Sequence, residues 1–310
     1  MFKELWKAHF ALFMVNALYG ASHVIAKGVM PAYLSPNVFI LLRVTGATLL
    51  FWLLLFGKKN LRIDKKDVPL FALCGLFGVA INQLFFFHGL NLSSSINSGI
   101  IMTVNPILVV ILSYFILKEK ITGRKSVGIV LGATGAVLLT LAGGTGKGDS
   151  LLGDFFLFIN AASYAIYLVI AKPLMQRYSP LKVITWVFTF GLLYVLLFPP
   201  TLTDLGSVDF AAIPQDIWIK IVYVIVGVTF LTYLLTMYGL KYLTPSVSSA
   251  YIYLQPVLVI LFAVLFSSIG IAEDYTDTIT FEKLAYMLLI FVGVYLTGSS
   301  SFLKRMKRTK

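Results

Sequence analysis

The chain has 310 residues, of which 59% are hydrophobic and 12% are charged, and its mean hydropathy is +0.90. Soluble domains carry about 25% charged residues, so this composition excludes a water-soluble protein. The formal net charge of +12 does not indicate nucleic-acid binding, because the basic residues lie in short segments between long apolar blocks. We therefore expect lipid as the surrounding medium and no nucleic-acid partner.

Ten apolar segments are long enough to cross a bilayer. A helix rises about 1.5 Å per residue, so about 20 residues span a hydrocarbon core of about 30 Å. The predicted spans are 9–28, 36–56, 68–89, 94–117, 126–143, 154–172, 181–200, 218–240, 246–270 and 283–303. No small-residue cleavage site follows the basic N-terminus, so we expect the first span to be a retained helix.

The distribution of basic residues predicts the topology. The two ends of the chain and one set of alternate connections together carry twenty Lys and Arg residues, whereas the opposite set carries four. Cytoplasmic loops are enriched in these residues. The sequence therefore predicts an all-α integral membrane protein of ten transmembrane helices with both termini in the cytoplasm.

The chain contains an internal repeat. Val24–Lys27 recurs as Val169–Lys172, and residues 89–116 align without gaps on 239–266. Each half contains five predicted helices, and because five is an odd number the second half enters the membrane from the opposite face. Two inverted five-helix repeats can open a central site first to one side of the membrane and then to the other.

The repeat divides the chain into parts. The first repeat is predicted over 1–143, a linker over 144–152, the second repeat over 153–303, and a basic cytoplasmic tail over 304–310. The linker is rich in glycine but lacks the first glycine and the Ser/Thr of a phosphate-binding loop, so we interpret it as a flexible connection.

Several motifs occur in an order that resembles the EamA-type branch of the drug/metabolite transporter superfamily. They are the run HGLNLSSS from His88 to Ser95, the helix break Asn105-Pro106, and the segment KEKIT over Lys118–Thr122. The resemblance covers residues 9–303. It implies ten helices and transport of small organic molecules, often amino acids or related metabolites and commonly outward.

The resemblance also implies a cavity lined mainly by the first, third, fourth, sixth, eighth and ninth helices. Tyr19 and Tyr164 stand where the family often has tryptophan, and the second half lacks a copy of the motif around Glu119. These departures leave the type of solute open.

Polar side chains follow one face of six predicted helices. Asn16, Tyr19 and His23, for example, are spaced by three and four residues, which places them on one helix face. Polar groups are costly in a bilayer and usually face protein or water, although hydrogen bonding between helices is an alternative explanation for any one of them. The candidate cavity residues are Asn16, Tyr19, His23, Asn82, Gln83, Asn97, Asn105, Tyr164, Tyr167, Thr232, Tyr233, Tyr253 and Gln255.

Two prolines occupy matching positions in the two halves. Pro106 and Pro256 fall within predicted helices, and each is expected to free a backbone carbonyl one turn earlier and to kink its helix. Paired helix breaks near the midplane indicate a transport site.

Carboxylates are absent from the predicted helix interiors, because all thirteen Asp and Glu residues lie in loops or at helix ends. Ion-coupled carriers usually hold their ion with an intramembrane carboxylate, so we expect a uniporter or exchanger of neutral or zwitterionic solutes. Proton coupling through His23 is an alternative. Arg43 is the one charge well inside a span, and it is expected to bind either helix-end carbonyls or a substrate carboxylate.

Other function classes fit less well. A membrane hydrolase needs a facing nucleophile and base or clustered metal ligands, and His9, His23 and His88 have no metal-binding spacing. We expect no enzymatic activity, cofactor or metal, whereas a channel or a lipid-moving protein stays open. The expected location is the bacterial inner membrane, the expected partners are a small-molecule solute and the bilayer, and the chain is a monomer or a homodimer.

Overall fold

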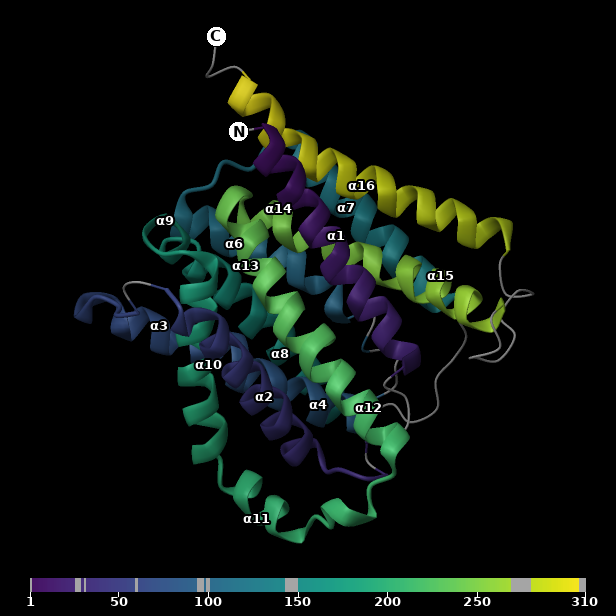
Figure 1. Cartoon of the computed structure of the whole chain (residues 1–310). Helices are drawn as coiled ribbons and strands as arrows, with labels where there is room; N and C mark the ends of the chain where they lie inside the picture. Colours follow the sequence, from purple (N-terminus) through teal and green to yellow (C-terminus); the bar gives the residue numbers. More distant parts are fainter. Residues whose placement is uncertain are drawn as a thin grey trace.

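The computed structural model describes residues 2–25, 29–30, 32–58, 61–93, 98, 101–142, 150–268 and 280–306. Within these ranges the secondary structure is entirely helical, and the helices form one bundle (Figure 1). The predicted cavity residue Asn97, most of the predicted linker and the end of the predicted tail lie outside the described residues. The side chain of His23 also lies outside them.

The predicted span 36–56 coincides with α2, and the span predicted from residue 68 begins with α3. In contrast, α1 begins at Phe2, seven residues before the predicted start, and α6 begins at Val104, ten residues after the predicted start. The third helix of this half is continuous through a π-helical segment, η2. The elements are α1 (Phe2–Ile25), α2 (Pro36–Phe56), η1 (Lys65–Asp67), α3 (Val68–Gly75), η2 (Leu76–Ile81), α4 (Asn82–Leu92), α6 (Val104–Leu117) and α7 (Gly123–Leu141).

The second half repeats this order and adds short outer elements. Its third long helix also contains a π-helical segment, η4, and its fourth is interrupted by a 3-10 stretch, η5. The elements are α8 (Leu151–Ala171), α9 (Leu174–Arg177), α10 (Pro180–Leu197), α11 (Pro199–Ser207), η3 (Phe210–Ala212), α12 (Gln215–Tyr223), η4 (Val224–Leu231), α13 (Thr232–Tyr242), α14 (Pro245–Ala250), η5 (Tyr251–Leu254), α15 (Gln255–Ser268) and α16 (Phe281–Met306).

Matching helices of the two halves start with the same local chemistry. Ser35 and Ser179 cap α2 and α10, and each side chain accepts a hydrogen bond from the backbone N–H three residues later, with proline next in the chain. Thr122 and Thr280 precede α7 and α16, and each accepts a hydrogen bond from the backbone N–H three residues later. Such caps satisfy a backbone donor that has no partner inside the helix, so the repeat in sequence reappears as a repeat in helix starts.

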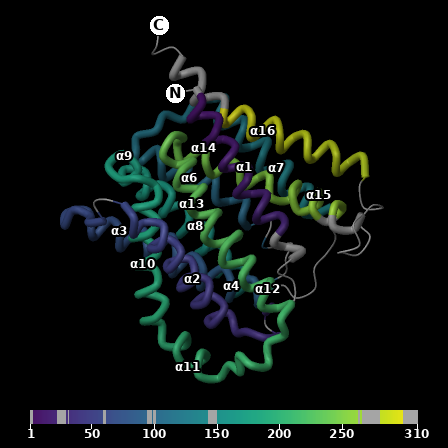
Figure 2. Tube along the Cα trace, in the orientation of Figure 1, coloured from purple at the N-terminus to yellow at the C-terminus, as the bar shows by residue number. Residues whose placement is uncertain are grey.

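The packing is symmetric when the two halves are exchanged. α4 packs on α8 as α13 packs on α1, and α6 packs on α8 as α15 packs on α1. The remaining helices pair across the halves, α2 with α10 and α7 with α16, so segments far apart in sequence lie side by side (Figure 2).

Eight helical segments among the described residues are long and apolar enough to cross a membrane. Two further main helices are not among the eight: α6 is apolar but has only 14 residues, and α1 has 24 residues. The chain is therefore an all-helical, multi-pass membrane protein.

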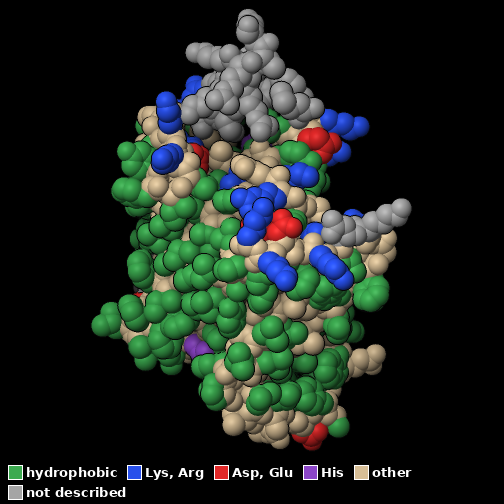
Figure 3. Space-filling view, turned by 90° about the vertical axis from the view of Figure 1, so that its left-hand side faces the viewer, with side chains coloured by type: hydrophobic (Ala, Val, Ile, Leu, Met, Phe, Trp, Pro, Cys, Tyr) green, Lys and Arg blue, Asp and Glu red, His purple; other side chains and the backbone are tan. Residues whose placement is uncertain are grey.

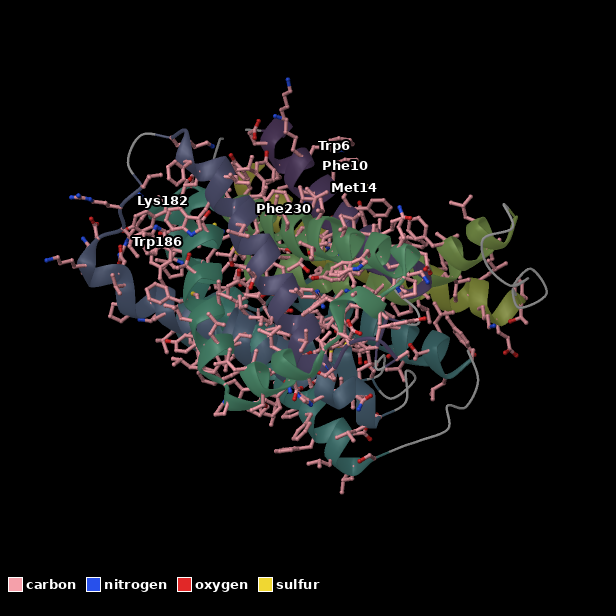
Figure 4. All side chains as sticks on the ribbon, turned by 60° about the horizontal axis from the view of Figure 1, so that its bottom comes forward. Trp6, Phe10, Met14, Lys182, Trp186 and Phe230 are labelled. Carbon is pink, nitrogen blue, oxygen red and sulfur yellow. The ribbon has the colours of Figure 1, made fainter. Side chains whose placement is uncertain are left out.

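The outer surface of the bundle suits lipid. Figure 3 shows a wide apolar band, with Lys and Arg side chains gathered toward the end of the molecule at which both termini lie in Figure 1. Trp6, Phe10 and Met14 lie along one stretch of α1 (Figure 4), where the Trp6 and Phe10 rings stack with centroids 5.6 Å apart and are largely exposed. Exposed aromatic side chains near a helix end are typical of the membrane interface.

Candidate functional site

The two π-helical segments occupy equivalent places in the repeat. Both end immediately before a polar pair, Asn82-Gln83 after η2 and Thr232-Tyr233 after η4. A π turn widens a helix and changes the partners of its carbonyls, and such segments often lie at functional sites. Sequence patterns did not predict them, because no proline or polar residue marks their start.

Tyr233 connects the two widened helices. Its hydroxyl donates to the carbonyl of Gly78 in η2 at 3.1 Å and lies 3.3 Å from Asn82 Oδ1. On α1, the Tyr19 hydroxyl accepts from Thr232 Oγ1 at 3.4 Å. The polar pairs that follow the π segments therefore face the interior of the bundle and contact the opposite half.

A second set of contacts runs through α8. Asn160 Nδ2 donates to the carbonyl of Asn82 at 2.7 Å, and Asn105 Nδ2 donates to the carbonyl of Ala161 at 2.7 Å. These side chains join α4, α6 and α8 within the buried part of the bundle. Hydrogen bonds between membrane helices contribute about 0.6 kcal/mol each on average, so this set defines helix positions more than it adds stability.

Four tyrosines gather where the halves meet. Tyr19, Tyr164, Tyr167 and Tyr233 lie near one another, and the ring centroids of Tyr164 and Tyr167 are 5.9 Å apart. Tyr167 is fully buried, and its hydroxyl lies 3.3 Å from the sulfur of Met237. Tyr19 and Tyr164, like Asn82, keep part of their surface accessible although they lie inside the bundle.

Three predicted cavity residues carry buried polar atoms without a hydrogen bond of good geometry. They are Asn16 and Asn105, through Oδ1, and Gln83, through both amide atoms. Gln83 is 3% exposed and lies beside the Tyr233 hydroxyl. A buried polar atom without a partner is costly, and a bound solute that supplied one would relieve that cost.

Arg43 of α2 lies against this cluster. Its Nε donates to Thr229 Oγ1 of η4 at 2.9 Å, and its guanidinium lies over the rings of Phe39 and Phe87, 5.5 and 4.8 Å from their centroids. The bond to a threonine hydroxyl was not anticipated from the sequence, because it depends on the packing of α2 against η4.

The remaining predicted residues lie along the fourth helix of each half. α6 begins two residues before Pro106, and α15 begins one residue before Pro256, with Gln255 as its first residue. Tyr253, in the 3-10 stretch η5, donates from its hydroxyl to the carbonyl of Thr103 at 3.3 Å. Pro106 therefore lies in the first turn of α6, where the missing N–H costs little. Pro256 lies inside the continuous helical span Pro245–Phe262, directly after its 3-10 stretch.

His88 does not join the tyrosine cluster. Its Nε2 lies 2.9 Å from Asn37 Oδ1, and Asn37 Nδ2 and Ser35 Oγ donate to the carboxylate of Asp204 in α11. The two hydrogen bonds from Ser35 and Asn37 hold the pKa of Asp204 below its usual value. This network links α2, α4 and α11 near the end of the bundle opposite the termini.

The cluster offers binding rather than bond-making chemistry. Apart from Arg43, its described members are amides, hydroxyls and aromatic rings. Among the described residues, no three His, Cys, Asp or Glu side chains lie together as metal ligands. The arrangement can hold a small polar or aromatic molecule through hydrogen bonds and ring contacts.

Comparison with known proteins identifies the family. The profile of the EamA-like transporter family matches residues 6–141 and 151–299. The chain is 27% identical over 279 residues to the uncharacterized transporter YetK of Bacillus subtilis (strain 168), an alignment that covers 88% of this chain and 82% of YetK. It is 23% identical over 192 residues, 62% of each chain, to a protein of Streptantibioticus cattleyicolor named a probable terminal-alkyne amino-acid exporter.

A solved crystal structure has the same fold. It superposes with a TM-score of 0.72 at 19% identity and covers 96% of this chain and 98% of that one. The family and the names of the relatives indicate a transporter rather than an enzyme. Because the profile match spans both halves, the chain belongs to the EamA-like transporter family.

Proposed function

We propose that the chain moves a small organic metabolite across the membrane by alternating access, with the tyrosine and amide cluster as the binding site. The observation that carries the proposal is the cluster itself: neutral polar side chains from α1, α4, α8 and α13 meet between the two halves, inside a bundle that lies in lipid. Partly accessible Tyr19, Asn82 and Tyr164 suit a site that a solute can reach.

The proposed architecture is ten transmembrane helices in two inverted five-helix repeats. The exchange symmetry of the helix packing supports it, as do the matching caps and π segments. Rocking of one repeat against the other would expose the cluster to each side in turn.

The proposed solute is an amino acid or a similar neutral or zwitterionic metabolite, exported by uniport or exchange. The absence of Asp and Glu from the described cluster favours neutral solutes over organic cations, which need a counter-charge. The relative named as an amino-acid exporter supports the same class.

Counterflow tests the mechanism. Purified protein in liposomes preloaded with one unlabelled amino acid should take up the same labelled amino acid faster than empty liposomes do, because a carrier returns loaded faster than empty. The panel should contain the twenty amino acids, each with and without a pH gradient. Uptake that trans-loading never accelerates would identify a channel instead, and strict dependence on the gradient would favour proton coupling through His23.

The proposed orientation places both termini in the cytoplasm of a bacterium, with the bundle in the inner membrane. Cys74 is the single cysteine and is fully buried, so a membrane-impermeant maleimide would report only an introduced cysteine. K58C should be protected in intact cells and D209C should react, because the two loops lie on opposite sides. Reaction of both from the same side would refute the inverted arrangement.

A further inference from the structure

Arg43 is a full charge inside the bundle. It is the eighth residue of α2, which places it about 10 Å from the start of that helix, and it is 6% exposed. A buried, unpaired charge is costly, and a charged residue at membrane depth usually has a function.

The contacts of Arg43 within the protein are neutral. Nε donates to the hydroxyl of Thr229, and the guanidinium lies over two phenylalanine rings. Its two terminal nitrogens have no hydrogen-bond partner among the described residues, and none of the ion pairs found there includes Arg43.

No carboxylate among the described residues forms an ion pair with Arg43. Asp204 contacts α2, but through Ser35 and Asn37, which precede Arg43 by eight and six residues and so lie about 9 to 12 Å away along the helix axis. That separation exceeds the length of an ion pair.

The free edge of Arg43 belongs to the proposed binding site. Its partner Thr229 lies one helical turn before Tyr233, and the neighbouring Thr232 donates to the Tyr19 hydroxyl at 3.4 Å, so Arg43 lies beside two members of the central cluster. Thr229 fixes the Nε side of the guanidinium, which leaves the terminal nitrogens for another acceptor. A guanidinium presents a planar fork of donors that matches the two oxygens of a carboxylate.

We propose that Arg43 binds a carboxylate of the solute and that this carboxylate is required for transport. This inference rests on the proposed function and specifies which end of the solute the site recognises. The described side chains around Arg43 are Thr229, two phenylalanines and two tyrosines, which supply no negative charge for an ammonium group. The site therefore accepts a 2-hydroxy acid as well as the corresponding amino acid, and it rejects the amino-acid amide.

A thermal-shift panel on the purified full-length protein tests this selectivity. The panel contains the twenty L-amino acids, their amides and the corresponding 2-hydroxy acids. At least one amino acid and its hydroxy acid should raise the melting temperature, and the matched amide should not. R43Q should weaken the response to the two acids by about 10- to 100-fold, the range expected for a lost charge-assisted hydrogen-bonded contact.

Two further variants separate recognition from folding. R43K keeps the charge but not the fork, so if R43Q does not fold, R43K should still show a weakened response to the acids. R62Q removes an arginine from an exposed loop and should respond like the unmodified protein. If Arg43 had only a structural role, its substitution would change the melting temperature of the free protein without changing the preference for acid over amide.

The failure of this inference differs from the failure of the proposed function. If amides stabilise the protein as well as acids do, or if no acid shifts the unmodified protein more than R43Q, the carboxylate proposal is wrong. If an uncharged solute shows counterflow at the same rate in R43Q and in the unmodified protein, Arg43 is not required for solute binding, and the transporter proposal still holds. Absence of counterflow with every solute would instead reject the transport mechanism.

Discussion

Two equivalent contacts between the halves solve the same packing problem in opposite ways. Where α3 meets α10, Gly75 lies against Phe190, and a Cβ on Gly75 would be 2.7 Å from the Phe190 Cβ. Where η4 meets α2, the repeat positions are exchanged: Ile225 stands in place of Gly75, and Gly46 in place of Phe190. A Cβ on Gly46 would be 2.6 Å from the Ile225 Cγ2.

The comparison shows that the symmetry belongs to the scaffold and not to individual residues. Each contact needs one large and one absent side chain, and either helix can supply the glycine. The chemistry is less symmetric still, because the position that matches Arg43 in the second half is Val187 and the polar pair that matches Asn82-Gln83 is Thr232-Tyr233. At these matching positions the first half supplies a charge and two amides, whereas the second half supplies an apolar side chain and two hydroxyls.

The largest expected effect is that of G75A. The added methyl would lie 2.8 Å from the backbone N of Gly191 and the backbone O of Val187, and backbone atoms move only if the helices separate. We expect a loss of about 2 to 3 kcal/mol, measured as a lower melting temperature in detergent. G206A is the control, because no atom lies within 4 Å of its added Cβ.

G46A tests the mirrored contact and should cost less, about 1 kcal/mol. The neighbour here is a side chain, which can rotate. Adding I225L should restore part of the loss, because leucine has no methyl on Cβ, and the two substitutions should be non-additive. Equal losses for G46A and G75A would show that it makes no difference whether the added methyl lies against a side chain or against backbone atoms.

Y233F removes the hydroxyl that joins the two π-bearing helices. We expect a stability loss near the 0.6 kcal/mol typical of hydrogen bonds between membrane helices. We also expect slower counterflow, because the carbonyl of Gly78 loses its donor and Asn82 Oδ1 loses a polar neighbour. Y242F is a control outside the cluster. If counterflow were unchanged and only stability fell, Tyr233 would be a structural residue rather than part of the site.

The smallest expected effect concerns acid stability at Asp204. Because its pKa is lowered in the folded protein, the carboxylate stabilises the fold above the ordinary Asp pKa of about 3.9, and this contribution is lost as the pH falls through the lowered value. D204N should therefore flatten the fall in melting temperature below about pH 4, by less than about 1 kcal/mol. D209N, an exposed carboxylate in the next loop, should retain the fall.

Apolar length and helix-start signals made the fold predictable. Ser35 and Pro36 marked the start of α2, and the helical, membrane-embedded character and the family were predicted from the sequence and are confirmed. The π segments were not predicted, because no residue type in the sequence marks where they begin. Polar stripes indicated which helix faces point inward. The hydrogen bond between Arg43 and Thr229 depends on how α2 packs on η4, and the spacing of residues along one helix does not specify that packing.

The hydroxyl of Thr229 joins Arg43 to the winding of η4. Thr229 Oγ1 donates to the carbonyl of Val224, five residues earlier, and accepts from Arg43. Rewinding η4 as an α-helix would turn Thr229 by up to about 100° around the axis, the rotation of one residue, and would withdraw its hydroxyl from the guanidinium. If Arg43 binds the solute as proposed, solute binding and the winding of η4 are thermodynamically linked, and amide hydrogen exchange across residues 224–231 would then change when solute binds.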